Sequence, residues 1–265
     1  YKVHPYRWPT IGLSVDDIKN ASHEDIKSFF AQHYAVNNLI LCVSGHIEFE
    51  KAVALTEKWF GDFAPANIPV RNLPQEPVQT EQRFMSVTRE VPQNVLTMMY
   101  HMCGRRDADY QVCDMLSDVL SNGMSSRFYR NVLVKSGLFT ELDASVSGTY
   151  DPGLFIVRAR LADGVSFDKA KDAIDAELAD FLRNGATAYE IEKCANKYES
   201  TRLFDMITYE KKGVKLCQYE LLGDAADINK EVGKYRCITQ DRLMNVAKNL
   251  LNPDNCSILY YGPDA

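Results

Sequence analysis

Histidine and cysteine are the side chains of this sequence best suited to binding a transition metal. His101 and Cys103 lie two positions apart in a predicted strand, where side chains at i and i+2 share one face. A zinc site in a protein takes three or four ligands at recognisable spacing, and no further ligands accompany this pair. We therefore interpret His101 and Cys103 as structural. His33, on an apolar helix face, is interpreted as a core or boundary histidine.

Two arginines form a second candidate for chemistry. Arg127 and Arg130 belong to the stretch GMSSRFYRNVLVKSGLFTELDASV, residues 123–146. Apolar residues at helical spacing predict a helix after the small-residue turn, and Gly137 is expected to end it. The two arginines either point into a cavity and attract an acidic peptide or cover apolar area on a helix surface. The sequence leaves both alternatives open.

The strand predicted after Gly137 alternates in character. We expect one face to carry Leu138, Thr140, Leu142, Ala144 and Val146, and the other Phe139, Glu141, Asp143 and Ser145. An exposed strand edge receives an extended peptide through main-chain hydrogen bonds. Residues 94–102 and 138–148 are both candidate strands for this role.

Composition and charge exclude several classes of function. The 265 residues are 46% hydrophobic and 25% charged, which is typical of a globular protein, and the net charge is −6. No basic stripe is present for a nucleic acid, and no apolar run has the length of a membrane helix. We expect a soluble protein, cytoplasmic or periplasmic. The seven cysteines are odd in number and lie mostly among apolar neighbours, which predicts reduced core thiols.

Prolines and an internal repeat predict the domain organisation. Four prolines fall within residues 65–81, which we interpret as a linker between residues 1–64 and 82–265. Residues 238–262 repeat the layout of residues 21–45 without a gap: a capped helix, a turn with asparagine, an apolar strand and a glycine. The identical spacing predicts a duplicated domain. The first copy is incomplete, and we expect it to continue upstream of Tyr1.

Four segments together are typical of one protein family. They are HPYRWPTIG from His4, HEDIKSFFAQHYAVNNLILCVSG from His23, GMSSRFYRNVLVKSGL from Gly123 and NGATAYEIEKCANKY from Asn184. In this order they resemble the family of pitrilysin, insulin-degrading enzyme and mitochondrial processing peptidase, the inverted-motif zinc proteases. The resemblance implies an α+β fold, with a mainly antiparallel sheet backed by helices. It also implies two homologous domains that enclose an unfolded peptide, with zinc in the first.

The resemblance places the zinc outside these residues. The family's motif is H-x-x-E-H, with two histidines one helical turn apart and a glutamate that activates the metal-bound water. No two histidines of this sequence have that spacing, and the family's order places the motif upstream of His4. We therefore expect zinc in the longer protein, and neither a metal ligand nor a catalytic residue here. Alone, the chain is expected to cleave nothing.

The resemblance also suggests where a peptide is held. Many active members supply an Arg, followed seven residues later by a Tyr, from the second domain. The corresponding positions here are Leu133 and Thr140. The candidate substrate-binding residues are therefore Arg127, Arg130, Leu133 and Thr140.

The presence of Leu133 and Thr140 at these two positions is compatible with two functions. In the first, the chain is the C-terminal portion of a zinc metalloendopeptidase-like protein acting on extended or unfolded peptides, and forms the cavity wall and the substrate-contacting domain. In the second, it belongs to a non-catalytic peptide-binding or assembly subunit of a two-chain peptidase. The expected partners are a peptide and either a second homologous subunit or a second copy of the chain.

Overall fold

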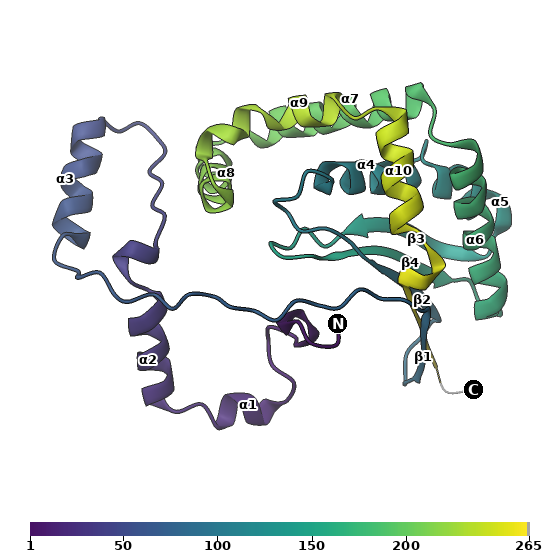
Figure 1. Cartoon of the computed structure of the whole chain (residues 1–265), viewed down its shortest axis with the longest axis horizontal. Helices are drawn as coiled ribbons and strands as arrows, with labels where there is room; N and C mark the ends of the chain where they lie inside the picture. The colour runs from purple at the N-terminus through teal and green to yellow at the C-terminus, as the bar shows by residue number, and fades with distance from the viewer. Residues whose placement is uncertain (264–265) are drawn as a thin grey trace. The chain divides into compact units, whose positions relative to one another are not determined.

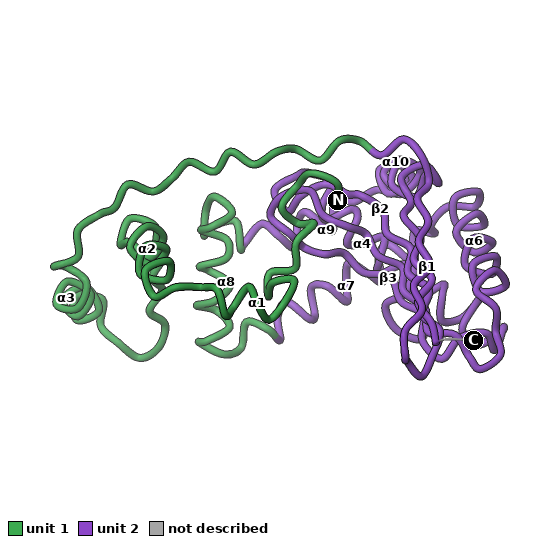
Figure 2. Tube along the Cα trace, turned by 90° about the horizontal axis from the view of Figure 1, so that it is seen from below, with its two compact units in different colours: residues 1–78, 205–228 green, residues 79–204, 229–265 purple. Residues whose placement is uncertain are grey.

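A computed structural model describes residues 1–263 and divides the chain into two compact units. Unit 1 comprises residues 1–78 and 205–228, and unit 2 comprises residues 79–204 and those from 229 onward (Figure 2). The first unit's leading segment ends at Val78, within the predicted linker of residues 65–81. Residues 205–228 belong to the same unit because they contact this segment in space. The sequence pattern did not predict this grouping. The assignment of two peptidase-like domains stays a prediction.

Unit 2 contains a five-stranded sheet. Its strands are β1 (Arg83–Thr88), β2 (Val95–His101), β3 (Phe139–Val146), β4 (Leu154–Leu161) and β5 (Cys256–Gly262). Their order is β1-β5-β2-β4-β3, in which only the β1–β5 pairing is parallel. The predicted α+β fold with a mainly antiparallel sheet is confirmed. Because β2 lies between β5 and β4, only β3 of the two predicted candidate strands is at an edge.

Helices cover one face of this sheet (Figure 1). The helices of unit 2 are α4 (Tyr110–Ser121), α5 (Val134–Ser136), α6 (Phe167–Asn184), α7 (Ala188–Asp205, whose last residue falls in unit 1), α9 (Glu231–Arg236) and α10 (Gln240–Leu250). Period-two alternation explains the packing, since Leu96, Met98 and Tyr100 of β2 are buried while their neighbours are half-exposed. No helix of the described chain is both long and apolar enough to cross a membrane.

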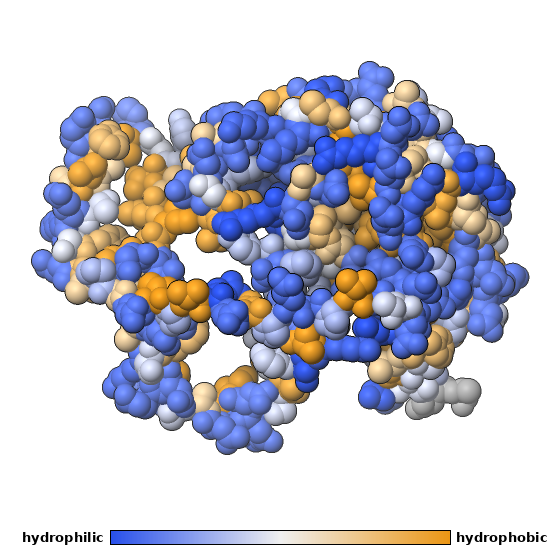
Figure 3. All heavy atoms as spheres, in the orientation of Figure 1, coloured by the Kyte–Doolittle hydropathy of each residue, from blue (hydrophilic) through white to orange (hydrophobic). Residues whose placement is uncertain are grey.

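Unit 1 consists of short helices joined by extended chain, and many of its apolar side chains lie at the surface (Figure 3). Its helices are η1 (Pro5–Arg7), α1 (Val15–Lys19), α2 (His23–His33), η2 (Val36–Asn38), α3 (Phe49–Phe60), α8 (Tyr209–Leu222) and η4 (Ala225–Asn229, whose last residue falls in unit 2). The prediction of a buried strand at residues 38–45 is wrong for the described chain. Residues 39–44 are extended but pair with no strand of residues 1–263, and Leu39, Leu41 and Val43 are exposed. A strand needs a neighbour to receive its backbone hydrogen bonds, and an apolar sequence alone does not supply one.

The two copies of the repeat adopt the same local structure in the helix and the turn, although only the second copy continues into a paired strand, β5. Helix α10 and the short helix η5 (Pro253–Asn255) lie 217 positions after α2 and η2, residue for residue. In each copy the asparagine that ends the short helix donates to the carbonyl of the same helix residue: Asn38 to His33 O at 2.8 Å and Asn255 to Leu250 O at 3.0 Å. These matches support the prediction of a duplicated unit.

Candidate functional site

Residues 123–146 form a helix–strand unit at one edge of the sheet. Phe128–Leu133 (η3) is a π-helix rather than the predicted α-helix: the Val134 N–H donates to Tyr129 O, five residues back. Gly137 then ends α5 in the left-handed conformation, with φ of 65°, before β3 begins. Wide turns of this kind are rare and occur frequently at functional sites. Hydrophobic spacing does not distinguish them from an α-helix.

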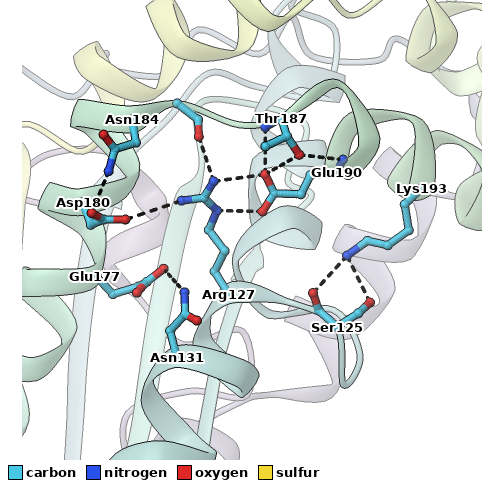
Figure 4. A network of polar contacts seen from close by, with 10 residues as sticks. Ser125, Arg127, Asn131, Glu177, Asp180, Asn184, Thr187, Glu190 and Lys193 are labelled. Atoms are coloured by element: carbon cyan, nitrogen blue, oxygen red, sulfur yellow. Dashed lines mark hydrogen bonds and ion pairs between the residues drawn. The ribbon is translucent and has the colours of Figure 1, made fainter.

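Arg127 lies at the start of this unit and is almost fully buried, with 8% exposure. Its Nε donates to Glu190 Oε1 at 2.8 Å and its Nη2 to Glu190 Oε2 at 3.0 Å (Figure 4). The same Nη2 donates to Gly185 O at 2.7 Å, and the guanidinium stacks over Phe181 at 5.0 Å. The guanidinium is therefore occupied by the protein itself and does not face solvent.

Glu190 is held in place by the helix that carries it. It forms a capping box with Thr187, and accepts from the N–H and the hydroxyl of Thr187 at 2.8 Å and 3.0 Å. Burial opposes ionisation of Glu190, but the hydrogen bonds from Arg127 and Thr187 outweigh it and hold the pKa of the carboxyl below its ordinary value. The beginning of α7 thus fixes the beginning of η3.

The other three predicted site residues are accessible to different extents. Arg130 is exposed and, within residues 1–263, its side chain makes no ion pair. Leu133 is half-buried and packs against the core. Thr140 is exposed, and its hydroxyl donates to Arg160 O at 3.4 Å. The structure thus separates Arg127, inside a buried network, from Arg130 and Thr140 on the surface.

Thr140 occupies a β-bulge. The register of β3 against β4 passes from Phe139↔Leu161 to Glu141↔Arg160, so Thr140 has no partner residue on β4. The extra residue reverses the predicted alternation at this end of the strand: Phe139 is buried and Thr140 is exposed, where the sequence pattern placed Thr140 with Leu142. The prediction of strict alternation is wrong here because a bulge leaves no mark in the hydrophobic pattern.

The free edge of β3 is partly occupied by α4. The Ala144 N–H donates to Ser121 Oγ at 2.8 Å, and the Ser121 hydroxyl donates to Ala144 O at 2.8 Å. Because both backbone groups of Ala144 bond to α4, they point away from β4, and the same holds by alternation for Leu142 and Val146. Ser121 therefore closes the middle of an edge that otherwise offers main-chain groups to an added strand.

The face of β3 and β4 that the helices leave uncovered is charged. Glu141 stands opposite Arg160, with an ion pair at 2.9 Å, and Asp143 stands opposite Arg158. Burial and the nearby Glu141 raise the pKa of Asp143, while Arg158 opposes this rise. Opposite charges in register stabilise a sheet surface and also give a peptide partners of both signs.

The described residues do not form a zinc site. Across residues 1–263 no group of three or more histidine, cysteine, aspartate and glutamate side chains is arranged to hold a metal ion. A catalytic zinc takes three protein ligands and a water. The donor set of residues 1–263 does not fit this requirement.

Comparison with known proteins identifies the family. Residues 20–198 match the family described as the peptidase M16 inactive domain. The chain belongs to this family. The resemblance predicted from the four sequence segments is therefore confirmed. The chain is 27% identical over 198 residues to the zinc protease PqqE of Helicobacter pylori, covering 73% of this chain and 44% of that protein.

Solved structures show the same fold. A protease from Helicobacter pylori matches 99% of this chain and 64% of its own, with a TM-score of 0.91 and 22% identity. A peptidase M16 inactive domain from Pseudomonas fluorescens matches 100% of this chain and 63% of its own, with a TM-score of 0.84 and 19% identity. The chain spans about half the length of the curated relatives it matches.

Proposed function

We propose that this chain is the substrate-contacting portion of a zinc metalloendopeptidase-like protein that acts on extended or unfolded peptides. The observation that carries the proposal is the position of β3. It is an edge strand with an exposed bulge at Thr140 near its start, and it follows the π-helix with the exposed Arg130 after only α5 and the turn at Gly137. An extended peptide laid against this edge meets main-chain groups of Leu142 and Val146.

The predicted site residues take different roles in this proposal. Arg130 and Thr140 are exposed and contact the peptide, and the half-buried Leu133 offers an apolar surface beside them. Arg127 acts as a positioning residue, because its ion pair with Glu190 fixes the start of η3. Neither Leu133 nor Thr140 provides a strong charged contact, so shape and main-chain pairing dominate recognition.

In this proposal, the zinc is bound by residues outside positions 1–263. The relatives named above include a zinc protease, and no donor set in the described chain fits the metal. In the longer protein, zinc supplies the water activation that hydrolyses the peptide bond. The residues of this chain bind and orient the peptide.

A second candidate function is a non-catalytic peptide-binding or assembly subunit. Leu133 and Thr140 favour it, because they stand where the family resemblance implies an arginine and a tyrosine. In that case a second homologous subunit, or a second copy of the same protein, completes the peptidase.

Peptide hydrolysis by the full-length protein separates the two functions. We expect an unfolded peptide to be cut, with activity lost in a chelator and restored by zinc. If the purified protein cuts nothing with zinc present but gains activity on addition of a homologous subunit, the second function holds. A protein that neither binds nor cuts unfolded peptides under either condition contradicts both.

A further inference from the structure

Unit 1 contains a cavity of about 650 Å³ between the extended residues 38–44 and helix α8. Its walls are largely apolar, with Ile40, Val214 and Leu221 among the lining residues. Two half-buried cysteines line this cavity: Cys42 on the extended segment and Cys217 on α8. A small reagent that enters the cavity therefore meets both thiols.

The local geometry brings the two cysteines together. Gly213 and Cys217 are four residues apart and share one face of α8. A Cβ atom at Gly213 would lie 3.2 Å from Ser44 Oγ, which is a tight contact, and 3.6 Å from Cys42 Sγ, so the glycine allows α8 to approach residues 42–44 closely. On the same helix face Cys217 Sγ lies 4.0 Å from Ile40 O, two residues before Cys42, so the two cysteines are neighbours.

We propose that Cys42 and Cys217 form a reversible disulfide that joins residues 38–44 to α8. The oxidant is a low-molecular-weight disulfide of the glutathione class. The thiolate of one cysteine attacks a sulfur of this disulfide, whose S–S bond breaks and releases one small thiolate. The thiolate of the second cysteine then attacks the mixed disulfide and releases the other. Two protein thiols are oxidised, one small disulfide is reduced to two thiols, and the two protons lost by the cysteines end on these products.

The environment of Cys42 predicts the pH dependence of this reaction. Burial, and then the neighbouring Cys217, raise the pKa of the Cys42 thiol above its ordinary value. Because the thiolate is the nucleophile, formation of the disulfide should become faster as pH rises above neutrality. The other ionisable side chain that lines the cavity is Glu210.

The rest of the chain supplies an internal comparison. Cys103 and Cys113 of unit 2 are also neighbours, but Cys113 is buried in the core, with 2% exposure. Cys237 is exposed and lies outside the cavity. Of the seven cysteines predicted to be reduced core thiols, Cys113, Cys194 and Cys256 are buried, whereas the proposed pair is accessible.

Peptide mapping of the oxidised protein tests the proposal. The intact 265-residue chain is incubated with oxidised glutathione, alkylated, and digested with trypsin without reduction. We expect a linked pair of peptides, residues 28–51 with residues 216–230, and a loss of two reactive thiols from these peptides that a reductant reverses. The matched control C237S should retain the link. C217S should lack it and leave Cys42 as a free thiol or a glutathione adduct.

Two results would overturn the proposal. One is recovery of Cys42 and Cys217 as separate alkylated thiols or separate glutathione adducts in the wild-type chain, with its circular dichroism unchanged. The other is a link from Cys42 to a different cysteine. Hydrogen exchange gives an independent readout, because the linked chain should show slower exchange in residues 209–222 than the same chain after reduction.

Discussion

Replacement of Arg127 by methionine tests how the helix–strand unit is held. The variant R127M keeps an unbranched side chain of similar length but removes the guanidinium from Glu190, whose side chain is only 12% exposed. The matched control is R130M, which makes the same change three residues later at an exposed position. The two variants differ in whether the lost charge is buried and paired.

The expected cost follows from the network around Arg127. The substitution removes two hydrogen bonds to Glu190 and one to Gly185 O, and leaves a buried carboxylate with Thr187 as its remaining donor. Removal of one partner from a buried ion pair costs about 3–5 kcal/mol. For a chain of this size that corresponds to a fall in Tm of about 10 °C. R130M should change stability by less than about 0.5 kcal/mol, as expected of an exposed site.

The pH dependence of this difference has a defined sign. The folded-state pKa of Glu190 is lowered from 4.5, so its ion pair contributes stability above pH 4.5 and loses it as pH falls through the folded pKa. The gap in Tm between wild type and R127M should therefore narrow below pH 4.5. Thermal unfolding followed by circular dichroism measures it. If R127M unfolds like wild type and loses only peptide binding, Arg127 is a substrate ligand and the positioning role is refuted.

Three further substitutions probe the same region. R130A should weaken the binding of an acidic peptide roughly two- to fivefold and leave the binding of an uncharged peptide unchanged, as measured by fluorescence anisotropy. An equal loss of affinity for both peptides would show that Arg130 makes no charge contact. S121A removes both side-chain hydrogen bonds to Ala144 and should lower the free energy of unfolding by about 1–2 kcal/mol, with faster amide exchange at Ala144. Unchanged amide exchange would show that Ser121 does not cover this edge of β3. G137A places a side chain at φ of 65° and should lower the free energy of unfolding in urea by about 1 kcal/mol, whereas G137N should lower it less. Equal losses of stability would show that the left-handed backbone conformation is not the cause.

The sequence predicted the elements of unit 2 better than their local irregularities. The family resemblance implied the α+β fold, and the strands β2 and β3 and the helix end at Gly137 follow from residue types at short range. The bulge at Thr140 and the π-helix from Phe128 do not, because both change which residues face the core without changing composition. A prediction from hydrophobic periodicity alone assigns a regular strand and a regular α-helix to these residues.

The sequence also did not predict which charged side chains are buried. Arg127 and Arg130 are three residues apart and chemically identical, yet one is paired with Glu190 and the other faces solvent. The difference depends on α7, whose contact with η3 joins residues 63 positions apart. Residues 38–45 show the same dependence, because an apolar run becomes a paired strand only beside a partner.

Hydrogen exchange with bound peptide tests the central claim most directly. The 265-residue chain is compared with and without an acidic unfolded peptide, at a concentration near its Kd and at a saturating one, with R130A as a variant whose binding is impaired at the lower concentration. If β3 and η3 contact substrate, amide protection should increase in residues 128–148, less so in R130A, while β2 in the interior of the sheet stays unchanged. Protection confined to other segments, or none at peptide concentrations that saturate binding, would contradict the claim that this edge receives the peptide.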